Sequence, residues 1–424
     1  MTFGWENAQS LLGLIVIVLV CWALSEARGR FPWRLVIGAT VLQAAIVMAL
    51  FGLPGAHAAL DGFSRAVDGL TSASAAGTQF VFGYLAGGPQ PYPVSNAGAQ
   101  FIFAFQVLPL ILVVSAISAV LWHFGVLTML VRVFGLLFEK SMGLRGAEAL
   151  SVALNVFLGN IETPLVIKAW LNRLTRAELF LMMVVGLSSV AGSVMAAYAL
   201  ILKPVVPDAA GHVLAASVLS APAGVALARI MIPETADAPG TLDEQPQMKY
   251  DGWLDAVVKG VSDGLNVALN VGAVLLVCVA LVALIDQILN LFPTVAGAPI
   301  TLDRIFGLIL TPLAWLMGAP WREAPEAARL LGIKLTRTEF VSFLQLGQGN
   351  DGLSVRTRIL LTYALCGFAN FATVGTTALG VSVLVPERRN EVLGLVWKAL
   401  FAAFLANVMS GAVVGTLPMA LISR

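Results

Sequence analysis

Two glutamates stand in apolar surroundings, where a lipid bilayer would penalise their charge. Glu162 lies in the segment GNIETP, between SVALNVFL and LVIKAW, and Glu339 lies in LTRTEFVSF. A carboxylate at the centre of a bilayer costs roughly 2.5 to 3.5 kcal/mol even on lenient scales. We therefore expect both side chains to face the protein interior, where they can bind a polar ligand or a cation.

The composition indicates a polytopic membrane protein. Hydrophobic residues make up 58% of the 424 residues and charged residues only 12%, whereas soluble domains contain about 25% charged residues. The net charge of +1 gives no indication of a nucleic-acid partner. Cys21, Cys278 and Cys366 are far apart and form no metal-binding spacing.

Long apolar stretches predict eight membrane crossings. A helix that crosses the hydrocarbon core needs about 20 apolar residues, and the sequence offers eight stretches of suitable length at 7–25, 35–52, 101–131, 179–202, 209–228, 264–285, 359–386 and 392–422. Between the second and third, residues 54–100 are more polar and predict an interfacial helix followed by a loop.

Basic residues in the first loop predict the orientation. Arg28, Arg30 and Arg34 follow the first crossing, and no Lys or Arg precedes it. The positive-inside rule places this loop in the cytoplasm. With eight crossings, both termini are then expected in the periplasm. The basic residues between 304 and 358 favour the opposite orientation.

Each glutamate lies in a segment whose two arms are each too short to cross the membrane. Thirteen uncharged residues separate Glu148 from Glu162, a helical rise of about 20 Å. We predict a re-entrant hairpin that breaks at 159–164. Residues 325–348 predict a second hairpin that breaks at 336–338, because Glu326 and Glu339 are 13 positions apart and the first pair of glutamates is 14 apart.

The stretches after the two hairpins are also similar. The 179–202 stretch is interrupted by GLSSVAGS from Gly186, and the 359–386 stretch by GFANFATVG from Gly367. With 305–321 counted as interfacial, three crossings separate the hairpins, so the repeats are inverted. Inverted repeats with discontinuous helices are typical of secondary transporters, which bind their ligand where the broken segments meet.

The broken segments contribute carboxylates, amides and hydroxyls, with no certain arginine. This set favours a neutral ligand rich in hydroxyls, such as a sugar or a nucleoside, together with a monovalent cation. Phe368 and Phe371 could flank a flat ring. Alternatively, the glutamates form structural ion pairs and the amides and serines, including Asn155 and Asn270, bind helix to helix. The polar residues that we expect to converge are Asn160, Glu162, Ser188, Ser189, Glu339, Asn370 and Thr373.

Three motifs resemble those of the concentrative nucleoside transporter family. GNIETPLVIKAWL is similar to the family's first-hairpin signature, Gly-Gln-Thr-Glu followed by a small residue, Pro and Leu. LLGIKLTRTEFVSF is similar to its Asn-Glu-Phe-Val-Ala-Tyr motif, and CGFANFATVG to its Cys-Gly-Phe-Ala-Asn-Phe-Ser-Ser motif. The resemblance extends from Leu144 to the C-terminus.

The resemblance implies a homotrimer whose three transport domains move like elevators, each with its own site. It implies that the nucleobase faces Asn160, Ile161, Glu162 and Val194, and that the ribose is held by Glu339, Asn370 and Thr373, with Phe368 lining the pocket. It places sodium at Asn155, the backbone of Leu158, Ser189 and the backbone of Val190. Asn160 and Ile161 replace the family's Gln and Thr, which puts base selectivity in question.

The chain is expected to divide into five parts. These are a scaffold part at 1–140, a first transport repeat at 141–232, an aqueous linker at 233–256, a long scaffold span at 257–300, and an interfacial helix with the second transport repeat at 301–424.

The predicted function is sodium-coupled import of uridine-like nucleosides across a bacterial inner membrane, in contact with lipid and without enzymatic activity. The alternative is proton-coupled nucleoside symport. Two other classes are less consistent with the sequence: a hydrolase with a Glu162 and Glu339 dyad, which would lack a further nucleophile or metal, and a channel, which would not accumulate its substrate. No Walker motif is present, which argues against primary transport by this chain alone.

Overall fold

The chain is α-helical, as a computed structural model shows for residues 4–93, 101–144, 146–160, 162–234, 250–295, 297–349 and 352–422. No β-strand occurs in these described ranges, which confirms the predicted all-α class. Ile161 lies outside the described residues. The first helices are α1 (Trp5–Ala23), α2 (Trp33–Gly52), α3 (Pro54–Phe82), η1 (Gly83–Ala86), α4 (Phe103–Gln106), α5 (Leu108–His123) and α6 (Val126–Met142).

Two further groups of helices come after α6. The first consists of α7 (Gly146–Asn155), α8 (Glu162–Val166), α9 (Lys168–Leu171), α10 (Arg176–Ser188), α11 (Gly192–Leu202) and α12 (Ala209–Met231). After α13 (Trp253–Leu289), the second consists of α14 (Leu302–Met317), α15 (Ala324–Thr336), α16 (Glu339–Gly347), α17 (Val355–Leu365), α18 (Phe371–Leu384), η3 (Pro386–Arg388), α19 (Arg389–Gly415) and α20 (Met419–Ile422).

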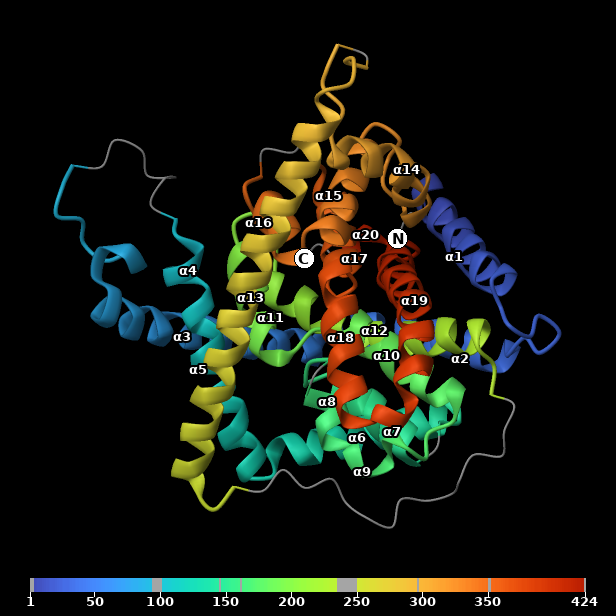
Figure 1. Cartoon of the computed structure of the whole chain (residues 1–424), viewed down its shortest axis with the longest axis horizontal. Helices are drawn as coiled ribbons and strands as arrows, with labels where there is room; N and C mark the ends of the chain where they lie inside the picture. Colours follow the sequence, from blue (N-terminus) through green and yellow to red (C-terminus); the bar gives the residue numbers. More distant parts are fainter. Residues whose placement is uncertain are drawn as a thin grey trace.

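The helices form a buried centre and an exposed periphery. In the most apolar stretch of α12, 94% of the residues are buried, but only 17% are buried in that of α13, although α13 is the more apolar helix. An apolar helix that buries so little of itself inside the chain presents its surface to lipid or to another subunit. Figure 1 shows α13, in yellow, running along one side of the molecule, and α19 lying on the far side of α17 and α18 from it.

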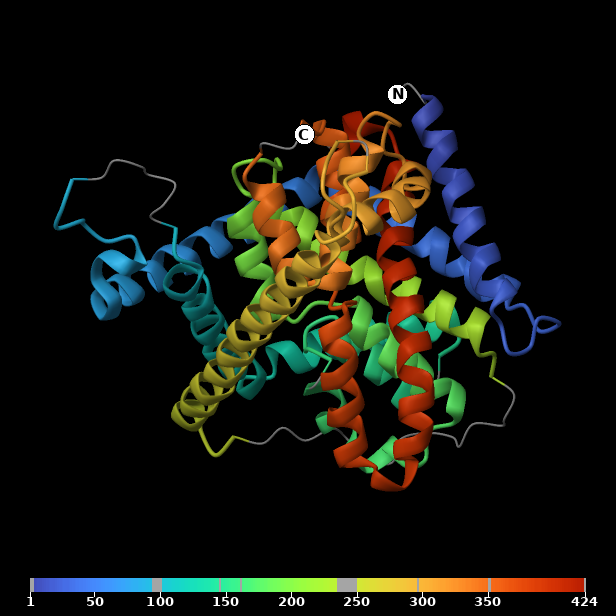
Figure 2. The same cartoon turned by 45° about the horizontal axis from the view of Figure 1, so that its top comes forward.

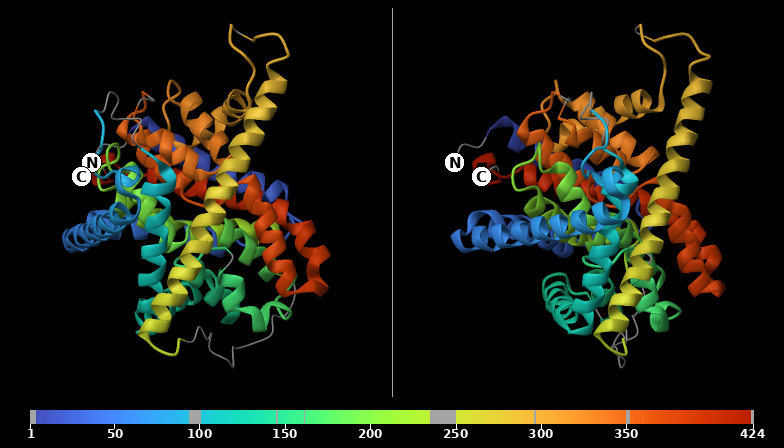
Figure 3. Two further views of the ribbon diagram at one scale, coloured as in Figure 1. Left: turned by 60° about the vertical axis from the view of Figure 1, so that its left-hand side comes forward. Right: turned by 90° about the vertical axis from the view of Figure 1, so that its left-hand side faces the viewer.

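The exposed helix α13 packs closely on α5. A Cβ atom added to Gly260 would lie 2.7 Å from Ala116 Cα, and one added to Gly264 would lie 2.8 Å from Leu112 Cα. Small residues four apart allow two membrane helices to approach backbone to backbone. The two helices run side by side in Figure 3, while α3 extends away from them.

Seven helices in the described part of the chain are long and apolar enough to cross a membrane. The sequence predicted eight crossings. The difference arises at residues 359–386, because residues 366–370 are not helical and divide this stretch into α17 and α18, each of them short. The helix α14 has 16 residues and is not among the seven.

The third predicted stretch, 101–131, is shorter in the structure. The helix α5 ends at His123, and α6 starts a new direction after Gly125, whose φ of 78° is left-handed. A left-handed residue ends a right-handed helix, and glycine adopts this conformation without steric cost. The third predicted crossing is therefore confirmed over Phe103–His123, but its extension to residue 131 was wrong.

The same order of elements occurs twice. In the first repeat, one short arm is α7 and the other is α8 with α9; the broken helix α10 and α11 and then the long helix α12 follow. In the second repeat, the short arms are α15 and α16; the broken helix α17 and α18 and then the long helix α19 follow. The α15 and α16 arms lie side by side, because Ser342 Oγ donates to Leu330 O at 2.7 Å. Both predicted helix breaks are confirmed, at 189–191 and 366–370. Figure 2 shows α18 and α19 running beside each other.

One buried arginine ties the first arm to α12. Arg229, with 9% of its side chain exposed, forms ion pairs with Glu148 of α7 and, at 3.0 Å, with Glu234. Removing one partner of a buried ion pair typically destabilises a protein by about 3 to 5 kcal/mol, because the other charge stays buried.

We expect Arg229→Met to lower the thermal unfolding midpoint of the detergent-solubilised protein clearly. The matched variant Lys203→Met breaks the pair with Asp68, in which both side chains are more than half exposed, and an exposed pair contributes about 0 to 1 kcal/mol. Equal midpoints for the two variants would contradict the structural role of Arg229.

Candidate functional site

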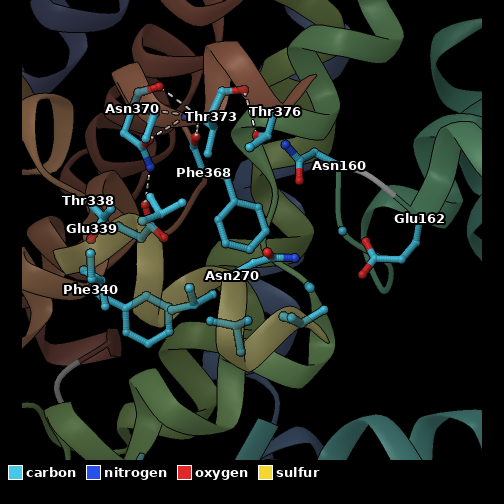
Figure 4. Close-up of a pocket in the computed structure, with 18 residues that line it drawn as sticks. Asn160, Glu162, Asn270, Thr338, Glu339, Phe340, Phe368, Asn370, Thr373 and Thr376 are labelled. Carbon is cyan, nitrogen blue, oxygen red and sulfur yellow. Dashed lines mark hydrogen bonds between the residues drawn. The ribbon is translucent and has the colours of Figure 1, made fainter. Parts of the chain in front are cut away.

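A cavity of about 130 Å³ lies where the two arms and the two broken helices meet, against α13. Its polar lining comes from both repeats, and α13 adds apolar side chains and Asn270. Figure 4 shows the labelled side chains around this cavity. The lining residues are Gly159, Asn160, Glu162, Ala191, Val194, Val267, Asn270, Val271, Val274, Leu275, Thr338, Glu339, Phe340, Phe368, Asn370, Ala372, Thr373 and Thr376.

Glu339 is held by two neutral donors. Tyr198 of α11 donates its hydroxyl proton to Glu339 Oε1 at 2.9 Å, and Asn370 Nδ2 donates to Glu339 Oε2 at 2.9 Å. Glu339 is the first residue of α16, where the helix dipole favours a negative charge. A carboxylate has about four acceptor positions, so these two bonds leave acceptor capacity on the cavity side.

Asn370 is fixed at the start of α18. Its Oδ1 accepts from the backbone N–H of Thr373 at 2.9 Å, and the Thr373 hydroxyl in turn accepts from the backbone N–H of Asn370 at 3.3 Å. This reciprocal capping satisfies two N–H groups that a helix start otherwise leaves unpaired. It also leaves the Asn370 amide nitrogen free to bond Glu339, as Figure 4 shows.

Glu162 lies on the other side of the cavity from Glu339 (Figure 4). It begins α8, and its carboxylate lies over the preceding break, since a Cβ atom on Gly159 would come within 2.3 Å of Glu162 Oε2. A larger residue at position 159 would therefore require the Glu162 carboxylate to move. Asn160 Nδ2 donates to Thr377 Oγ1 of α18 at 3.0 Å and so joins the first break to the second repeat.

Two of the aromatic predictions have different outcomes. Phe368 lines the cavity, as expected. Phe371 does not; it is 42% exposed, and its ring packs against Phe306 and Trp397, both at 6.2 Å between centroids. The expectation that Phe371 flanks a ligand was wrong, because its ring packs outside the cavity against Phe306 and Trp397.

The predicted sodium residues lie beside the cavity, where the break between α7 and α8 meets the break between α10 and α11. Gly192 N donates to Phe157 O at 2.9 Å, and Ser217 Oγ donates to Val156 O at 3.2 Å and to Val190 O at 3.4 Å. These bonds place Val156 and Phe157, which precede Leu158, against Val190 and Gly192 at the break between α10 and α11.

Asn155 supplies a buried oxygen at this junction. Its Nδ2 donates to Ser151 O at 3.0 Å, but its Oδ1 has no hydrogen-bond partner among the described residues. This oxygen points to α10, since a Cβ atom on Gly186 would lie 3.4 Å from it. A buried acceptor without a partner is costly unless a donor or a cation satisfies it. The oxygen-rich set therefore fits a monovalent cation. Of the other residues expected to converge, Ser188 does not line the cavity, because its hydroxyl donates to Val185 O at 3.2 Å.

Several site residues were not singled out by the sequence as ligand contacts. Tyr198 stands in the apolar run MAAYAL, where a hydroxyl in a membrane helix was the available signal. Asn270 was left open between helix contact and ligand, and the structure places it on the cavity wall. Thr376 lies one turn after Thr373 and donates to its carbonyl oxygen at 3.2 Å.

Family models match most of the chain. Residues 12–85 match the model for the N-terminus of Na+ dependent nucleoside transporters, and residues 212–415 match the model for their C-terminus. Residues 104–205 match a model described as nucleoside recognition. The nucleoside permease NupC of Helicobacter pylori is 33% identical over 418 residues, which cover 97% of this chain and 98% of that protein. The chain belongs to the concentrative nucleoside transporter family.

Solved structures of this family are similar throughout. The structure of the transporter CNTnw in an inward-facing, substrate-bound state has a TM-score of 0.87 and 34% identity, and covers 97% of each chain. A double variant of CNTnw in an outward-facing state has a TM-score of 0.85 and 33% identity, and covers 97% of this chain and 98% of that one. The relatives are transporters and permeases, so the enzyme alternative is set aside and this protein is a nucleoside transporter by family.

Proposed function

We propose that this transporter imports nucleosides together with sodium by alternating access. The observation that carries the proposal is Glu339, a buried carboxylate oriented by Tyr198 and Asn370 on the wall of a cavity. Beside this cavity lies an amide oxygen that has no hydrogen-bond partner in the described part of the chain. Acceptors of this kind suit the hydroxyls of a sugar, and the adjoining oxygens suit a cation.

The roles of the side chains depend on their places around the cavity. Glu339, Asn370 and Thr373 hold the ribose hydroxyls from the second repeat. Asn160, Glu162 and Val194 face the nucleobase from the first repeat, as does Ile161, for which no structure is described. Phe368, between the two groups, contacts the ring of the nucleoside.

Sodium binds between Asn155, the backbone of Leu158, Ser189 and the backbone of Val190. Its binding would order the first break, and because Asn160 and Glu162 belong to that break, it would raise the affinity for nucleoside. The same coupling makes nucleoside raise the affinity for sodium.

The proposed architecture has eight crossings, two re-entrant hairpins that enter from opposite faces, and a homotrimer in a bacterial inner membrane with both termini in the periplasm. The scaffold and transport parts are those predicted from the sequence. Two observations support an elevator-type movement: the exposed surface of α13, which suits a lipid or subunit interface, and the existence of inward-facing and outward-facing structures of the relative CNTnw.

The energy available from sodium is sufficient for uphill import. One sodium ion that enters down ~100 mV and a ~tenfold gradient releases roughly 2.3 plus 1.4 kcal/mol, enough for several-hundred-fold accumulation. The test is uptake of radiolabelled uridine into proteoliposomes with and without an inward sodium gradient. We expect accumulation only with the gradient. No uptake of any nucleoside would refute the substrate class.

Proton coupling is the second candidate, because Glu162 and Glu339 are both buried carboxylates at the cavity. It predicts that a pH jump drives uptake in the absence of sodium. Accumulation that is unaffected by removal of the sodium gradient would exclude sodium coupling and favour this alternative.

Base selectivity is expected to depend on Asn160. We expect Asn160→Gln to change the ratio of purine to pyrimidine uptake severalfold, with little change in sodium dependence. The reason is that the longer side chain moves the terminal amide away from its present position, where Asn160 Nδ2 donates to the Thr377 hydroxyl. Competition between labelled uridine and unlabelled adenosine measures this ratio. Thr377→Val removes the partner and leaves Asn160 in place, so it should shift the ratio in part; unchanged competition in both variants would contradict the role.

A further inference from the structure

A lysine ammonium is buried at the helix break of the second repeat. Lys334 of α15 is 0% exposed. Its Nζ donates to Ala364 O at 2.8 Å and to Asn407 Oδ1 at 2.7 Å, and lies 5.9 Å from the centre of the Phe404 ring. No carboxylate lies within 4 Å of this nitrogen in the described part of the chain. Its hydrogen-bond partners are therefore neutral oxygens beside an aromatic face, with the Glu339 carboxylate acting on it at longer range, and such surroundings suit a cation.

One of the two oxygens that Lys334 binds belongs to a helix end, and the other is a side-chain oxygen of Asn407 within α19. Ala364 O lies in the last turn of α17, and Asn407 Nδ2 donates to Cys366 O at 2.9 Å and to Ser188 O at 2.6 Å. Ser188 is the last residue of α10, so two helix C-termini meet at Asn407. The C-terminal end of a helix carries partial negative charge, and carbonyls freed at such ends coordinate cations in transporters with broken helices.

The position corresponds to the proposed sodium site of the first repeat. Lys334 precedes Glu339 by five positions, and the residue five positions before Glu162 is Phe157, which lies between Asn155 and Leu158. In each repeat this segment lies against the break of the next helix: Phe157 O accepts from Gly192 N, and Lys334 donates to Ala364 O.

The long helix that ends each repeat contributes a similar connection. Ser217 of α12 bonds Val156 O and Val190 O, and so joins the first arm to the break. Asn407 of α19 bonds Lys334 and Cys366 O, and so joins the second arm to its break. The two places differ in one respect: the first holds an amide oxygen without a partner among the described residues, and the second holds an ammonium.

We propose that the Lys334 ammonium is a tethered cation that occupies, in the second repeat, the place that sodium takes in the first. This inference rests on the proposed sodium coupling. The ammonium satisfies the carbonyl of Ala364 in the last turn of α17 without an ion from solution, and holds the break from which Asn370 reaches Glu339. Lys334 is thus a positioning residue, and it limits coupling to one sodium ion per nucleoside.

The first test needs no variant. In proteoliposomes of the unmodified protein, the ratio of radiolabelled sodium to radiolabelled uridine taken up should be about one. A ratio of about two would overturn the proposal, since it would require a second ion site besides the ammonium. No nucleoside uptake would instead refute the proposed function.

The second test removes the ammonium. Lys334→Ser leaves the carbonyls and Asn407 and adds a hydroxyl, so the variant should need a second sodium ion: the ratio should rise to about two, with a steeper dependence of uptake on sodium. Lys398→Ser is the matched control, because Lys398 lies on the exposed side of α19, paired with Glu26.

The other possible results of the Lys334→Ser experiment also test the proposal. A folded, monodisperse Lys334→Ser protein with the unmodified sodium dependence, or with no uptake at any sodium concentration, would show that Lys334 does not stand in for an ion. If Lys334→Ser does not fold, the ratio in the unmodified protein decides alone. If protons drive the unmodified protein, Lys334→Ser should acquire a sodium requirement that its parent lacks; no such requirement would overturn the proposal.

Discussion

Glu339→Gln is expected to lower nucleoside uptake at least ~30-fold. The carboxylate accepts from both Tyr198 and Asn370 and still has acceptor capacity toward the cavity. A glutamine has a single acceptor oxygen, so Tyr198, Asn370 and the substrate would compete for it. Leaving buried donors unsatisfied costs ~1 to 3 kcal/mol for each group, and the loss of charged acceptance of a ribose hydroxyl adds to this.

The measurement is the initial rate of uridine uptake into proteoliposomes at equal protein content. Glu326→Gln is the matched control: the same chemical change in the same pair of arms, at a side chain that is 30% exposed and paired with Arg329. We expect this control to stay within about twofold of the unmodified protein, as is usual for a surface ion pair. If Glu339→Gln kept more than a third of the uptake, the ribose role of Glu339 would be wrong.

Asn155→Leu is expected to abolish the effect of sodium on nucleoside binding. The buried Asn155 Oδ1, without a partner among the described residues, is the side-chain oxygen that we assign to sodium. Coupling between two sites typically amounts to ~1 to 3 kcal/mol, or roughly 5- to 150-fold in affinity. Nucleoside affinity in saturating sodium should therefore fall about tenfold or more, and affinity without sodium should hardly change.

Calorimetric titration of uridine in sodium and in choline buffers measures this difference. Asn390→Leu, at an exposed position near the start of α19, provides the control for the same change of side chain. Full sodium stimulation in Asn155→Leu would place the ion elsewhere. A loss of affinity that is equal in both buffers would indicate damage to the nucleoside site.

The two glutamates differ in how firmly their neighbours hold them. Glu339 is anchored by two side-chain donors from different helices, whereas Glu162 lies over Gly159 at the start of a short helix. A segment held by few side-chain bonds is more easily reordered by a ligand. This difference is consistent with sodium acting on the first break and with a preformed ribose site at the second.

The number of helices able to cross a membrane shows a limit of reasoning from hydropathy. Apolar length predicted a crossing at 359–386 and the motif from Gly367 predicted its interruption, but only the fold shows that the Cys366 carbonyl accepts from Asn407 and that the Phe368 N–H donates to Ser189 O. Such a break is tolerated at membrane depth only when it is buried in protein or lines a cavity. Gly125 likewise ends α5 at a residue whose conformation the apolar pattern does not reveal.

The sequence by itself determined the membrane character, the helical class, the two pairs of short arms, the breaks near Ser189 and Gly367, and the polar residues at those breaks. These features depend on composition, length and local backbone chemistry, which a linear pattern records directly. The motifs also identified the family.

Only the tertiary structure decided which polar groups meet. It brought Tyr198 to Glu339, turned Phe371 away from the cavity, left Asn155 Oδ1 without a partner among the described residues, and set Lys334 between α17 and α19. The physical reason is that these partners lie far apart in sequence, up to 141 residues for Tyr198 and Glu339. Their contacts depend on how buried helices pack, which local patterns do not specify.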